Sequence, residues 1–561
     1  MDKIKIVALG GLDEEGKDLY VVEINSDIFV FVCGMKNPTN LTPGIDFLIA
    51  DFTYLKERKD RIKAYIIPKT KKTNFGALPY IYQECPAPIY CTKLTADRII
   101  DFSKSYEVSS HFNFEFINLP DSKNISGHEI TFFSTCASMP LTFGFSIKTS
   151  LGNIVYSGDF IVEYNNEQYY KLDLNTLGKI AEEPTLILLS ESMNSSKTGY
   201  CSPNHRLYPF FKHCFDEVCG RCFVALSDDN LYHIDEFCNV CNEYNKKVVF
   251  YDRNTQEIFD SKKYGDFLPK INVLSIDDLL RNKEQDLVIL MTADPDDLYE
   301  KISLLCSGEN ELKQVKINEN DTFILAVSPS DKNEVIATST VDDLYKTGCN
   351  VHYIRKKELY KIHACEEDLR MLLSLLKPQY YFPIEGYYVD LLNNAKIAFD
   401  MKLNLSHKNI FLLDNGQALT IDQNGASVDF NYDGANCKVG ELMIDGVGFG
   451  DIVDEIINDR TRLGTDGVVV LGCAVSKSER KIIVTPDVQM RGFLYLKDKE
   501  ADAILKTITQ IYVDSINEWI KNTDDFDAFK IEEEIKNEIN KTLKHTINRE
   551  PVIKPNIIVL N

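Results

Sequence analysis

The segment from residue 64 to residue 80 constrains the fold and the chemistry of this chain more than any other. An apolar run predicts a short buried strand, and the following residues predict a turn that opens a helix: Ala64-Tyr65-Ile66-Ile67, then Pro68-Lys69-Thr70-Lys71-Lys72-Thr73-Asn74-Phe75-Gly76-Ala77-Leu78-Pro79-Tyr80. The turn carries three lysines, and a lysine ammonium group has three donors and no acceptor at neutral pH. Such a turn can pair with carboxylates or hold an anion, but its lysines cannot coordinate a metal ion.

Composition bounds the class of protein. The chain has 561 residues, of which 44% are hydrophobic, enough for sizeable cores and for two to four domains. The formal net charge of −23 argues against a protein that grips nucleic acid through overall basicity, although a local basic groove is compatible with it. No apolar run of about 18 residues predicts a membrane span, and the N-terminal residues contain no signal-peptide core. We therefore expect a cytoplasmic protein with no membrane partner.

The cysteines allow two interpretations. There are 15 of them, and an odd number without a visible export signal indicates reduced thiols. Two C-x-x-C pairs, Cys219/Cys222 and Cys238/Cys241, have a spacing that is compatible with a zinc site. Cys222 also begins an apolar strand, and Cys238 and Cys241 share one face of a predicted helix, which favours burial as small hydrophobic side chains. We favour buried thiols and leave the zinc interpretation open.

The chain divides into regions of different pattern. Strand-like segments and turns dominate residues 1–204, and residues 355–442 return to this pattern. Residues 205–354 alternate strand-like and helix-like segments, which predicts a parallel α/β sheet. Residues 450–561 predict a small α+β domain.

Within that last region the helical periodicity is clear. A second helix at residues 532–543 and a last strand at residues 552–560 follow a first, amphipathic helix. The predicted apolar face of the first helix comprises Ile504, Ile508, Ile511, Tyr512, Ser515 and Trp519.

Several segments, in chain order, resemble ribonuclease J of the metallo-β-lactamase superfamily. Residues 10–23 match the family's Gly-Gly-Leu-x-Glu-x-Gly-Lys-x-x-Tyr-Val-Val-Glu opening, residues 76–79 its Gly-Ala-Leu-Pro, and residues 486–493 its Pro-Asp-x-x-x-Arg-Gly-Phe. The resemblance covers essentially the whole chain. It implies an α/β fold: a metallo-β-lactamase αββα sandwich in two parts, an inserted β-CASP α/β domain and a small C-terminal α+β domain.

The metal-binding positions of that family are altered here. The family binds two zinc ions through a Thr-His-x-His-x-Asp-His run and three further motifs. The corresponding residues in this chain are Lys69, Lys71, Thr73, Asn74, Ala137, Asp159 and Glu385. Only Asp159 keeps the family residue, and zinc requires imidazole, thiolate or carboxylate ligands. We expect no metal and no cofactor, and we expect lysines of the turn to form ion pairs with Asp159 and Glu385.

The motifs of the inserted domain are partly kept. Glu191 occupies the family's acidic position after a buried strand, and His363 remains from a Gly-His-Gly-Ser motif that helps to hold the scissile phosphate. An Ala-Ser-Asn-x-His motif is blurred into residues 227–233, and whether His233 substitutes in it stays open. Residual catalytic candidates are Asp159, His363 and Glu385. Candidate substrate-binding residues are His363, Lys69, Lys71 and Glu191.

Three functional hypotheses follow. The first is a non-catalytic ribonuclease J paralogue of bacterial RNA processing and decay, which forms a hetero-oligomer with an active ribonuclease J or a homodimer and has RNA as a partner. The second is a metal-dependent 5′–3′ exo- or endoribonuclease whose single zinc ion is rebuilt around Asp159, Glu385 and His363. The third is an interaction protein that does not contact RNA.

Overall fold

The computed structural model describes most of the chain and divides it into two compact units. The described residues are 1–39, 42–108, 111–164, 168–218, 220–260, 262–275, 287–309, 315–330, 333–432, 437–446, 448–449, 454–493, 499–522 and 528–560. Unit 1 comprises Met1–Lys36 and Leu48–Leu442, and unit 2 comprises Asn37–Phe47 and Met443–Asn561. Among the described helices, none combines the length and the apolar character that crossing a membrane requires.

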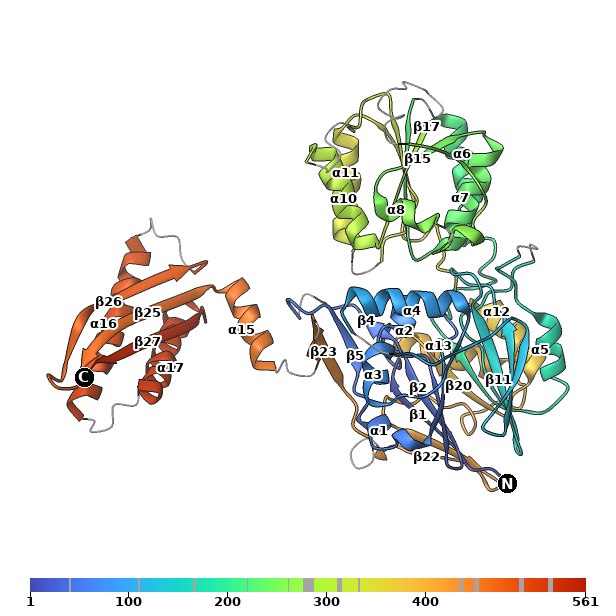
Figure 1. Ribbon diagram of the computed structural model, residues 1–561, viewed down its shortest axis with the longest axis horizontal. Coiled ribbons are helices and arrows are strands. Elements are labelled where there is room, and N and C mark those ends of the chain that lie inside the picture. Colours follow the sequence, from blue (N-terminus) through green and yellow to red (C-terminus); the bar gives the residue numbers. More distant parts are fainter. Residues whose placement is uncertain are drawn as a thin grey trace. The chain divides into compact units, whose positions relative to one another are not determined.

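Two sheets packed face to face form the centre of unit 1 (Figure 1). The first has the strand order β22-β21-β1-β2-β3-β6-β7-β8, and the second has the order β20-β13-β12-β11-β10-β9. The strands of the first sheet are β1 (Ile4–Gly10), β2 (Leu19–Ile24), β3 (Asp27–Phe31), β6 (Ile62–Ile66), β7 (Ile89–Cys91), β8 (Phe114–Phe116), β21 (Ala418–Asp422) and β22 (Gly425–Asp429). Those of the second are β9 (Asp121–Ile125), β10 (His128–Ser134), β11 (Phe143–Thr149), β12 (Gly152–Tyr156), β13 (Thr185–Glu191) and β20 (Tyr380–Ile384).

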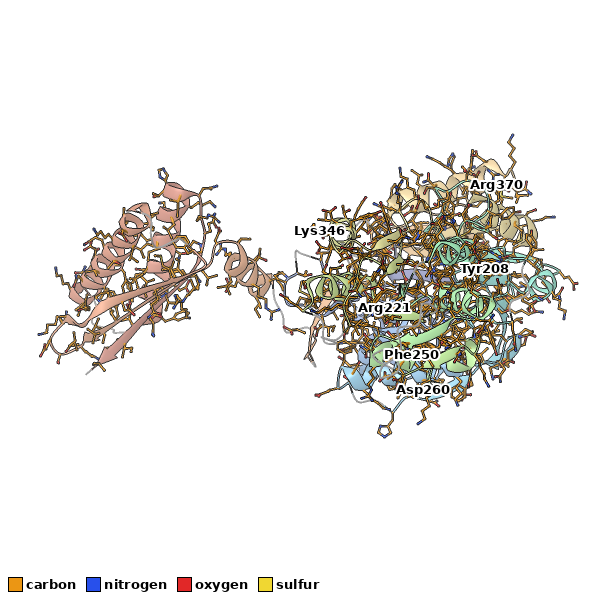
Figure 2. The ribbon with its side chains drawn as sticks, turned by 90° about the horizontal axis from the view of Figure 1, so that it is seen from above. Tyr208, Arg221, Phe250, Asp260, Lys346 and Arg370 are labelled. Atoms are coloured by element: carbon orange, nitrogen blue, oxygen red, sulfur yellow. The ribbon has the colours of Figure 1, made fainter. Side chains whose placement is uncertain are left out.

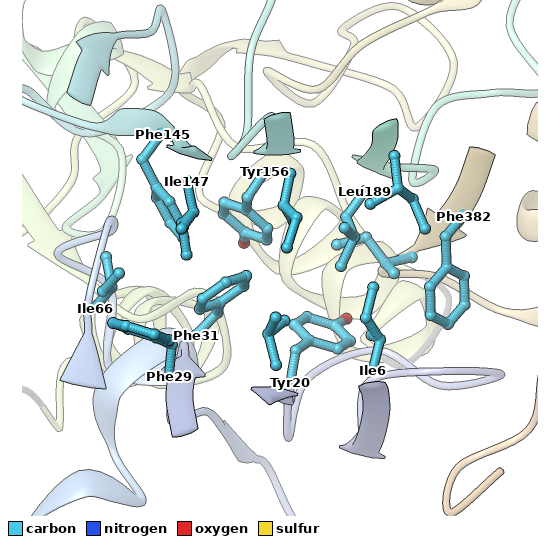
Figure 3. Packing of buried hydrophobic residues seen from close by; sticks show 14 of the residues in the cluster. Ile6, Tyr20, Phe29, Phe31, Ile66, Phe145, Ile147, Tyr156, Leu189 and Phe382 are labelled. Carbon is cyan, nitrogen blue, oxygen red and sulfur yellow. The ribbon is translucent and has the colours of Figure 1, made fainter. Parts of the chain in front are cut away.

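The alternation of side chains along these strands creates the core. In Figure 3, Ile6, Tyr20, Phe29, Phe31 and Ile66 of the first sheet point toward the second sheet, which contributes a facing set of labelled side chains: Phe145, Ile147, Tyr156, Leu189 and Phe382. Phe31 and Phe145 meet edge to face, with ring centroids 4.7 Å apart. Burying this much apolar surface between the sheets fixes the strand register, because a slip of one residue would turn the apolar set outward.

Helices cover the outer faces of the sandwich. Leu177, Leu372 and Leu373 from three-turn or shorter helices pack on the outer face of the second sheet against Val155 and Leu188. The helices of this part are α1 (Thr53–Lys56), α2 (Lys72–Phe75), α3 (Leu78–Glu84), α4 (Lys93–Ser105), α5 (Leu174–Ile180), α12 (Glu366–Leu376) and α13 (Tyr388–Asp400), with a 3-10 turn at Lys59–Arg61 and short strands β4 (Met35–Lys36) and β5 (Phe47–Ala50). The αββα arrangement implied by the resemblance is therefore present.

The inserted segment folds around a fully parallel sheet of order β16-β15-β17-β14-β18-β19, as its alternating pattern predicted. Helices lie on both faces (Figure 1). Arg221, labelled in Figure 2, donates two hydrogen bonds to Asp321, of 3.0 and 2.6 Å, at the start of two neighbouring strands. The elements are α6 (Tyr208–Glu217), β14 (Cys222–Ser227), α7 (Leu231–Glu243), β15 (Lys247–Phe250), α8 (Arg253–Ile258), a 3-10 turn (Gly265–Phe267), β16 (Asn272–Leu274), β17 (Leu287–Ala293), α10 (Pro295–Ser307), β18 (Thr322–Leu325), α11 (Glu334–Lys346) and β19 (Asn350–Tyr353).

A buried carboxylate ties together the loops around the insert's two junctions. Asp368, on the first turn of α12, accepts hydrogen bonds from the backbone N–H groups of Val162 (2.7 Å), Cys201 (2.8 Å) and Cys365 (3.0 Å). Burial raises the pKa of Asp368 to about 6, although these N–H groups act in the opposite direction. The chain leaves the sandwich and returns to it through segments held by this one side chain.

Unit 2 contains the small α+β fold predicted for residues 450–561, and it also includes Asn37–Phe47 and the residues from Met443 onward. Its strands have the order β26-β25-β27, with β25 antiparallel to β26 and parallel to β27. The predicted last strand is β27, and the predicted second helix lies within α17. The elements are β23 (Glu441–Asp445), β24 (Gly448–Phe449), α15 (Asp454–Thr465), β25 (Val468–Ser476), β26 (Lys481–Arg491), α16 (Lys499–Asn522), α17 (Ala528–Ile547) and β27 (Val552–Leu560).

The buried face of α16 differs from the predicted one. Ile508 and Tyr512 are buried as expected, but the stripe continues through Ile516 and Ile520, whereas Ser515 is only partly buried. The predicted Ile504, Ile511 and Trp519 are partly buried and pack against the same core, so the buried face is wider than predicted and includes Ile516 and Ile520, which the prediction left out. The helix itself was predicted correctly.

A first testable prediction concerns Tyr512, whose buried hydroxyl donates to the backbone oxygen of Asn556 at 2.8 Å. We expect Tyr512→Phe to lower the free energy of unfolding of unit 2 by about 1 kcal/mol, because the carbonyl loses its partner. The single tryptophan, Trp519, lies on α16, so its fluorescence during urea unfolding reports on this unit. Tyr345→Phe on α11 should leave that transition unchanged, and an equal shift in both variants would contradict the prediction.

Candidate functional site

The predicted site residues converge at the ends of strands from both sheets. Lys69 follows β6, Asp159 follows β12, Glu191 ends β13 and Glu385 follows β20. His363 lies in the segment before α12, which returns from the insert. Because β12, β13 and β20 are neighbouring parallel strands, their carboxyl ends lie at one edge of the second sheet, and this brings side chains from distant parts of the chain together.

Lys69 lies at the centre of this cluster. Its Nζ atom is 2.5 Å from Oδ1 of Asp159 and 2.6 Å from Oε2 of Glu385, and the lysine is 2% exposed. The predicted ion pairing of the lysine turn with these two carboxylates is confirmed for Lys69. Burial alone would lower the pKa of Lys69, but the charges of Asp159 and Glu385 outweigh it and raise the pKa above its usual value. Lys69 is therefore a charged, buried ammonium group.

The two carboxylates that share this ammonium group titrate differently. Burial raises the pKa of Glu385 to about 7, since Lys69 offsets it only in part and Asp159 adds to it. Burial would also raise the pKa of Asp159, but Lys69 and then His363 lower it to about 2. One ammonium cannot fully neutralise both groups. The Tyr156 hydroxyl donates a 2.7 Å hydrogen bond to Oε1 of Glu385 and satisfies its second oxygen.

The backbone at Glu385 is strained and firmly held. Its φ of 58° lies in the left-handed region, which non-glycine residues rarely adopt. Its N–H donates to the carbonyl of Gly11 (3.2 Å), and its carbonyl accepts from the N–H of Ser192 (3.1 Å). These bonds to two different segments fix the turn, so the carboxylate points at Lys69.

Glu191 positions the loops of two other site residues. Its Oε1 accepts hydrogen bonds from the N–H groups of Phe160 (2.8 Å) and Ala364 (3.1 Å), and its Oε2 lies 2.5 Å from Nδ1 of His363. Glu191 is fully buried. Burial would lower the pKa of His363, but Glu191 and Asp159 raise it above the usual value. These contacts make Glu191 a positioning group, since its oxygens are occupied by the protein itself.

The other lysines of the turn contact the insert. Lys71 Nζ lies 3.5 Å from Oδ2 of Asp229, and Lys72 Nζ lies 3.2 Å from Oδ2 of Asp294. Both pairs are more exposed to solvent than the Lys69 cluster. Lys71 was predicted from the sequence as a substrate-binding residue. Its carboxylate partner could not be predicted, because Asp229 lies far away in the chain.

His233 and the described cysteines of the two predicted pairs are not among the partners of Lys69, although the charges of Lys71 and Asp229 act on His233. His233 Nε2 contacts the carbonyl of His205 at 2.8 Å, and burial lowers its pKa to about 4. Cys222, Cys238 and Cys241 are buried in the core of the insert, where burial raises the pKa of each thiol. Cys219 lies outside the described residues. Within the described ranges, no cysteine belongs to a cluster whose donor atoms could hold a metal ion.

Sequence reasoning missed two members of the cluster. Tyr156 reads as an ordinary apolar strand residue, and only its place opposite Glu385 shows its role. Asp18 is buried nearby, and its pKa is raised well above the usual range by burial and then by the charge of Glu385. In the sequence, Asp18 directly precedes the apolar strand that begins with Leu19 and Tyr20, and this position of a carboxylate could have indicated that it is buried.

A two-sheet sandwich with an inserted parallel α/β domain and a cluster of charged residues at its strand ends is the architecture that the resemblance to the metallo-β-lactamase superfamily implied. The chain is similar to a solved structure described as a protein of unknown function from Enterococcus faecalis V583, with a TM-score of 0.50 and 14% identity over 74% of this chain and 100% of that one. At this identity the likeness concerns the fold alone.

Sequence comparison is more specific. Residues 455–560 match the ribonuclease J C-terminal domain. The chain is 28% identical over 560 residues to Ribonuclease J 2 of Staphylococcus aureus (strain NCTC 8325), covering 98% of this chain and 97% of that protein. It is also 28% identical over 554 residues to Ribonuclease J 2 of Staphylococcus epidermidis (strain RP62A), with the same coverage. The similarity to proteins named Ribonuclease J 2 therefore extends over nearly the whole of this chain.

The residues present do not fit the two zinc ions that the resemblance to the metallo-β-lactamase superfamily implies. Lys69 Nζ contacts both Asp159 and Glu385, which are the two carboxylates at family ligand positions, and an ammonium group repels a dication. Ala137 is a buried methyl group, and Thr73 and Asn74 replace charged or imidazole ligands. Among the described residues, one cluster of three donors remains, formed by Asp159, Glu191 and His363, whose ligand atoms lie within 4.8 Å of one another.

Proposed function

We propose that this chain is a non-catalytic ribonuclease J-type subunit of bacterial RNA processing and decay, which acts in the cytoplasm. The observation that carries the proposal is the buried ammonium group of Lys69 between Asp159 and Glu385. A dinuclear hydrolase needs two cations to clamp the attacking and leaving oxygens and to lower the pKa of a bound water. The ammonium group of Lys69 supplies positive charge at this place, but it cannot coordinate a water molecule as a metal ion does.

The proposed partners rest on the resemblance to the ribonuclease J family. A subunit without turnover can contribute by assembly, and we propose a hetero-oligomer with an active ribonuclease J, or a homodimer, that handles RNA. The net charge of −23 supports this, because a strongly acidic chain attracts RNA poorly by itself and gains from a partner that binds it.

One observation favours a second candidate, a metal-dependent exo- or endoribonuclease with a single rebuilt metal site. Asp159, Glu191 and His363 offer three donor atoms within reach of one ion, which is the number a catalytic zinc site uses. The sequence had proposed Glu385 in place of Glu191, but Glu385 faces Lys69 and Tyr156. The ammonium beside Asp159 and the two N–H groups on Glu191 oppose this candidate.

The two candidates predict opposite results for the purified chain. We expect less than about 0.1 equivalent of tightly bound zinc or manganese by elemental analysis, since three available ligands are the minimum for a catalytic site. We also expect no cleavage of a 5′-monophosphorylated RNA in the presence of either metal. Asp159→Asn serves as the control for contaminating nuclease, because it removes the central carboxylate. Stoichiometric metal together with turnover that Asp159→Asn abolishes would refute the proposal.

A further inference from the structure

The lysine turn faces an acidic edge of the insert. Asp229 follows β14 and Asp294 follows β17, two neighbouring parallel strands, so their side chains emerge at the same edge of the sheet. The N–H of Asp228 donates to the carbonyl of Ala293 at 3.0 Å and joins the two strand ends. Lys71 and Lys72 reach across from the sandwich and pair with one carboxylate each.

These pairs differ from the Lys69 cluster in their access to solvent. The Lys71 and Asp229 side chains are 23% and 47% exposed, and those of Lys72 and Asp294 are 46% and 25% exposed. Exposed ion pairs are weak, because water and salt compete for both partners. A lysine is also a point charge on a flexible stem, so its ammonium can change partners without moving the backbone.

Other contacts hold the insert against the sandwich without these pairs. Leu94 and Met139 of the sandwich lie within the apolar core of the insert, and the N–H of Tyr232 donates to the carbonyl of Ser138 at 3.1 Å. Tyr169 and Phe267 pack edge to face, with ring centroids 5.1 Å apart. Loss of the two ion pairs therefore frees the lysines but leaves the insert in place.

We propose that Lys71 and Lys72 form a binding site for the phosphodiester groups of single-stranded RNA, and that Asp229 and Asp294 of the insert occupy this site in the free chain. The carboxylates act as internal competitors, and RNA binds only by displacing them. This inference rests on the proposed function, because it specifies how the same site takes or refuses RNA. It does not require cleavage.

The decisive variant is Asp229→Asn/Asp294→Asn. Asparagine keeps the shape of each side chain and an oxygen that can accept the hydrogen bonds from Ser227 Oγ and from the N–H of Asp296, but it removes the charge. We expect a 3′-fluorescein, 5′-monophosphorylated RNA 20-mer to bind this variant about 10-fold more tightly than the parent by fluorescence anisotropy, with a steeper loss of affinity as salt rises. Asp229→Asn alone should give part of the gain and is the milder change.

Two matched variants separate this effect from a general change in charge. Asp342→Asn/Asp343→Asn removes the same number of carboxylates from α11, beside Lys346 at the surface of the insert (Figure 2), and should bind like the parent. Adding Lys71→Met/Lys72→Met to the decisive variant should abolish the gain. Unchanged affinity in the decisive variant, an equal gain in the α11 variant, or a gain that survives loss of the lysines would each overturn the inference. Metal-dependent turnover would refute the proposed function and leave this comparison intact.

Discussion

A Lys69→Met variant is expected to lose roughly 3–5 kcal/mol of unfolding free energy in unit 1, because removal of one partner leaves buried charges without compensation. Lys69 is buried and contacts Asp159 at 2.5 Å and Glu385 at 2.6 Å, and methionine fills similar volume without charge. Far-UV circular dichroism during urea unfolding follows the loss of secondary structure in both units. Trp519 fluorescence follows unit 2, whose transition should not change.

Two further variants test the cause of this loss. Lys361 pairs with Glu15 at the surface, so Lys361→Met should change stability by only about 0.5 kcal/mol. Lys69→Met/Glu385→Gln should be more stable than Lys69→Met, because it removes one of the two carboxylates left without a cation. If Lys69→Met unfolds like the parent, the ammonium does not hold the site together and the metal argument loses its physical basis.

The second large effect concerns pH. Glu385 by itself should raise the free energy of unfolding of unit 1 by roughly 2–3 kcal/mol as the pH is lowered from about 8 to about 5, and the difference between the parent and Glu385→Gln measures this contribution. The pKa of Glu385 is about 7 in the folded chain, against an ordinary 4.5, so the folded state binds this proton more tightly than the unfolded state does. The stabilisation is complete below the ordinary pKa and disappears as the pH rises through about 7. The raised pKa values of His363 and Asp368 act with the same sign, whereas the lowered pKa of His233 acts against them.

Asp159 has the opposite effect and sets an acid limit. Its pKa is about 2 in the folded chain, so its contribution is present above its ordinary pKa of 3.8 and is lost as the pH falls toward 2. We expect Glu385→Gln to reduce the rise in unfolding free energy between about pH 8 and pH 5, whereas the loss of stability near pH 2 that Asp159 causes should remain. Urea unfolding at unit steps of pH measures both. An unaltered rise in Glu385→Gln would show that another group carries it.

Much of the fold could be predicted from local pattern. The alternation of strands and helices in residues 205–354 correctly indicated a parallel sheet, and the last strand was predicted at its observed bounds, Val552–Leu560. These features depend on the period of apolar residues, which neighbouring positions determine. The buried face of α16 was predicted less accurately, because the residues that become buried depend on the helix and the sheet that pack against α16.

The site was predictable in its chemistry but not in its partners. The pairing of Lys69 was expected from its place among former ligand positions, whereas nothing local connects Lys71 with Asp229 or Lys72 with Asp294. Along an extended turn, neighbouring side chains point in different directions, and which of three lysines enters the interior depends on the surrounding strands. The same reason hid Tyr156, whose hydroxyl acts only because Glu385 lies opposite it.

The sequence by itself determined which atoms are available at the strand ends: amines, a methyl group and a few carboxylates, where a dinuclear metal site needs imidazoles. That is a property of residue type, and no folding changes it. Only the tertiary structure decided that Lys69 is buried between Asp159 and Glu385 while Lys71 and Lys72 meet the insert at the surface. Charge pairing depends on distance and solvent exposure, and both arise when segments far apart in the chain are brought together.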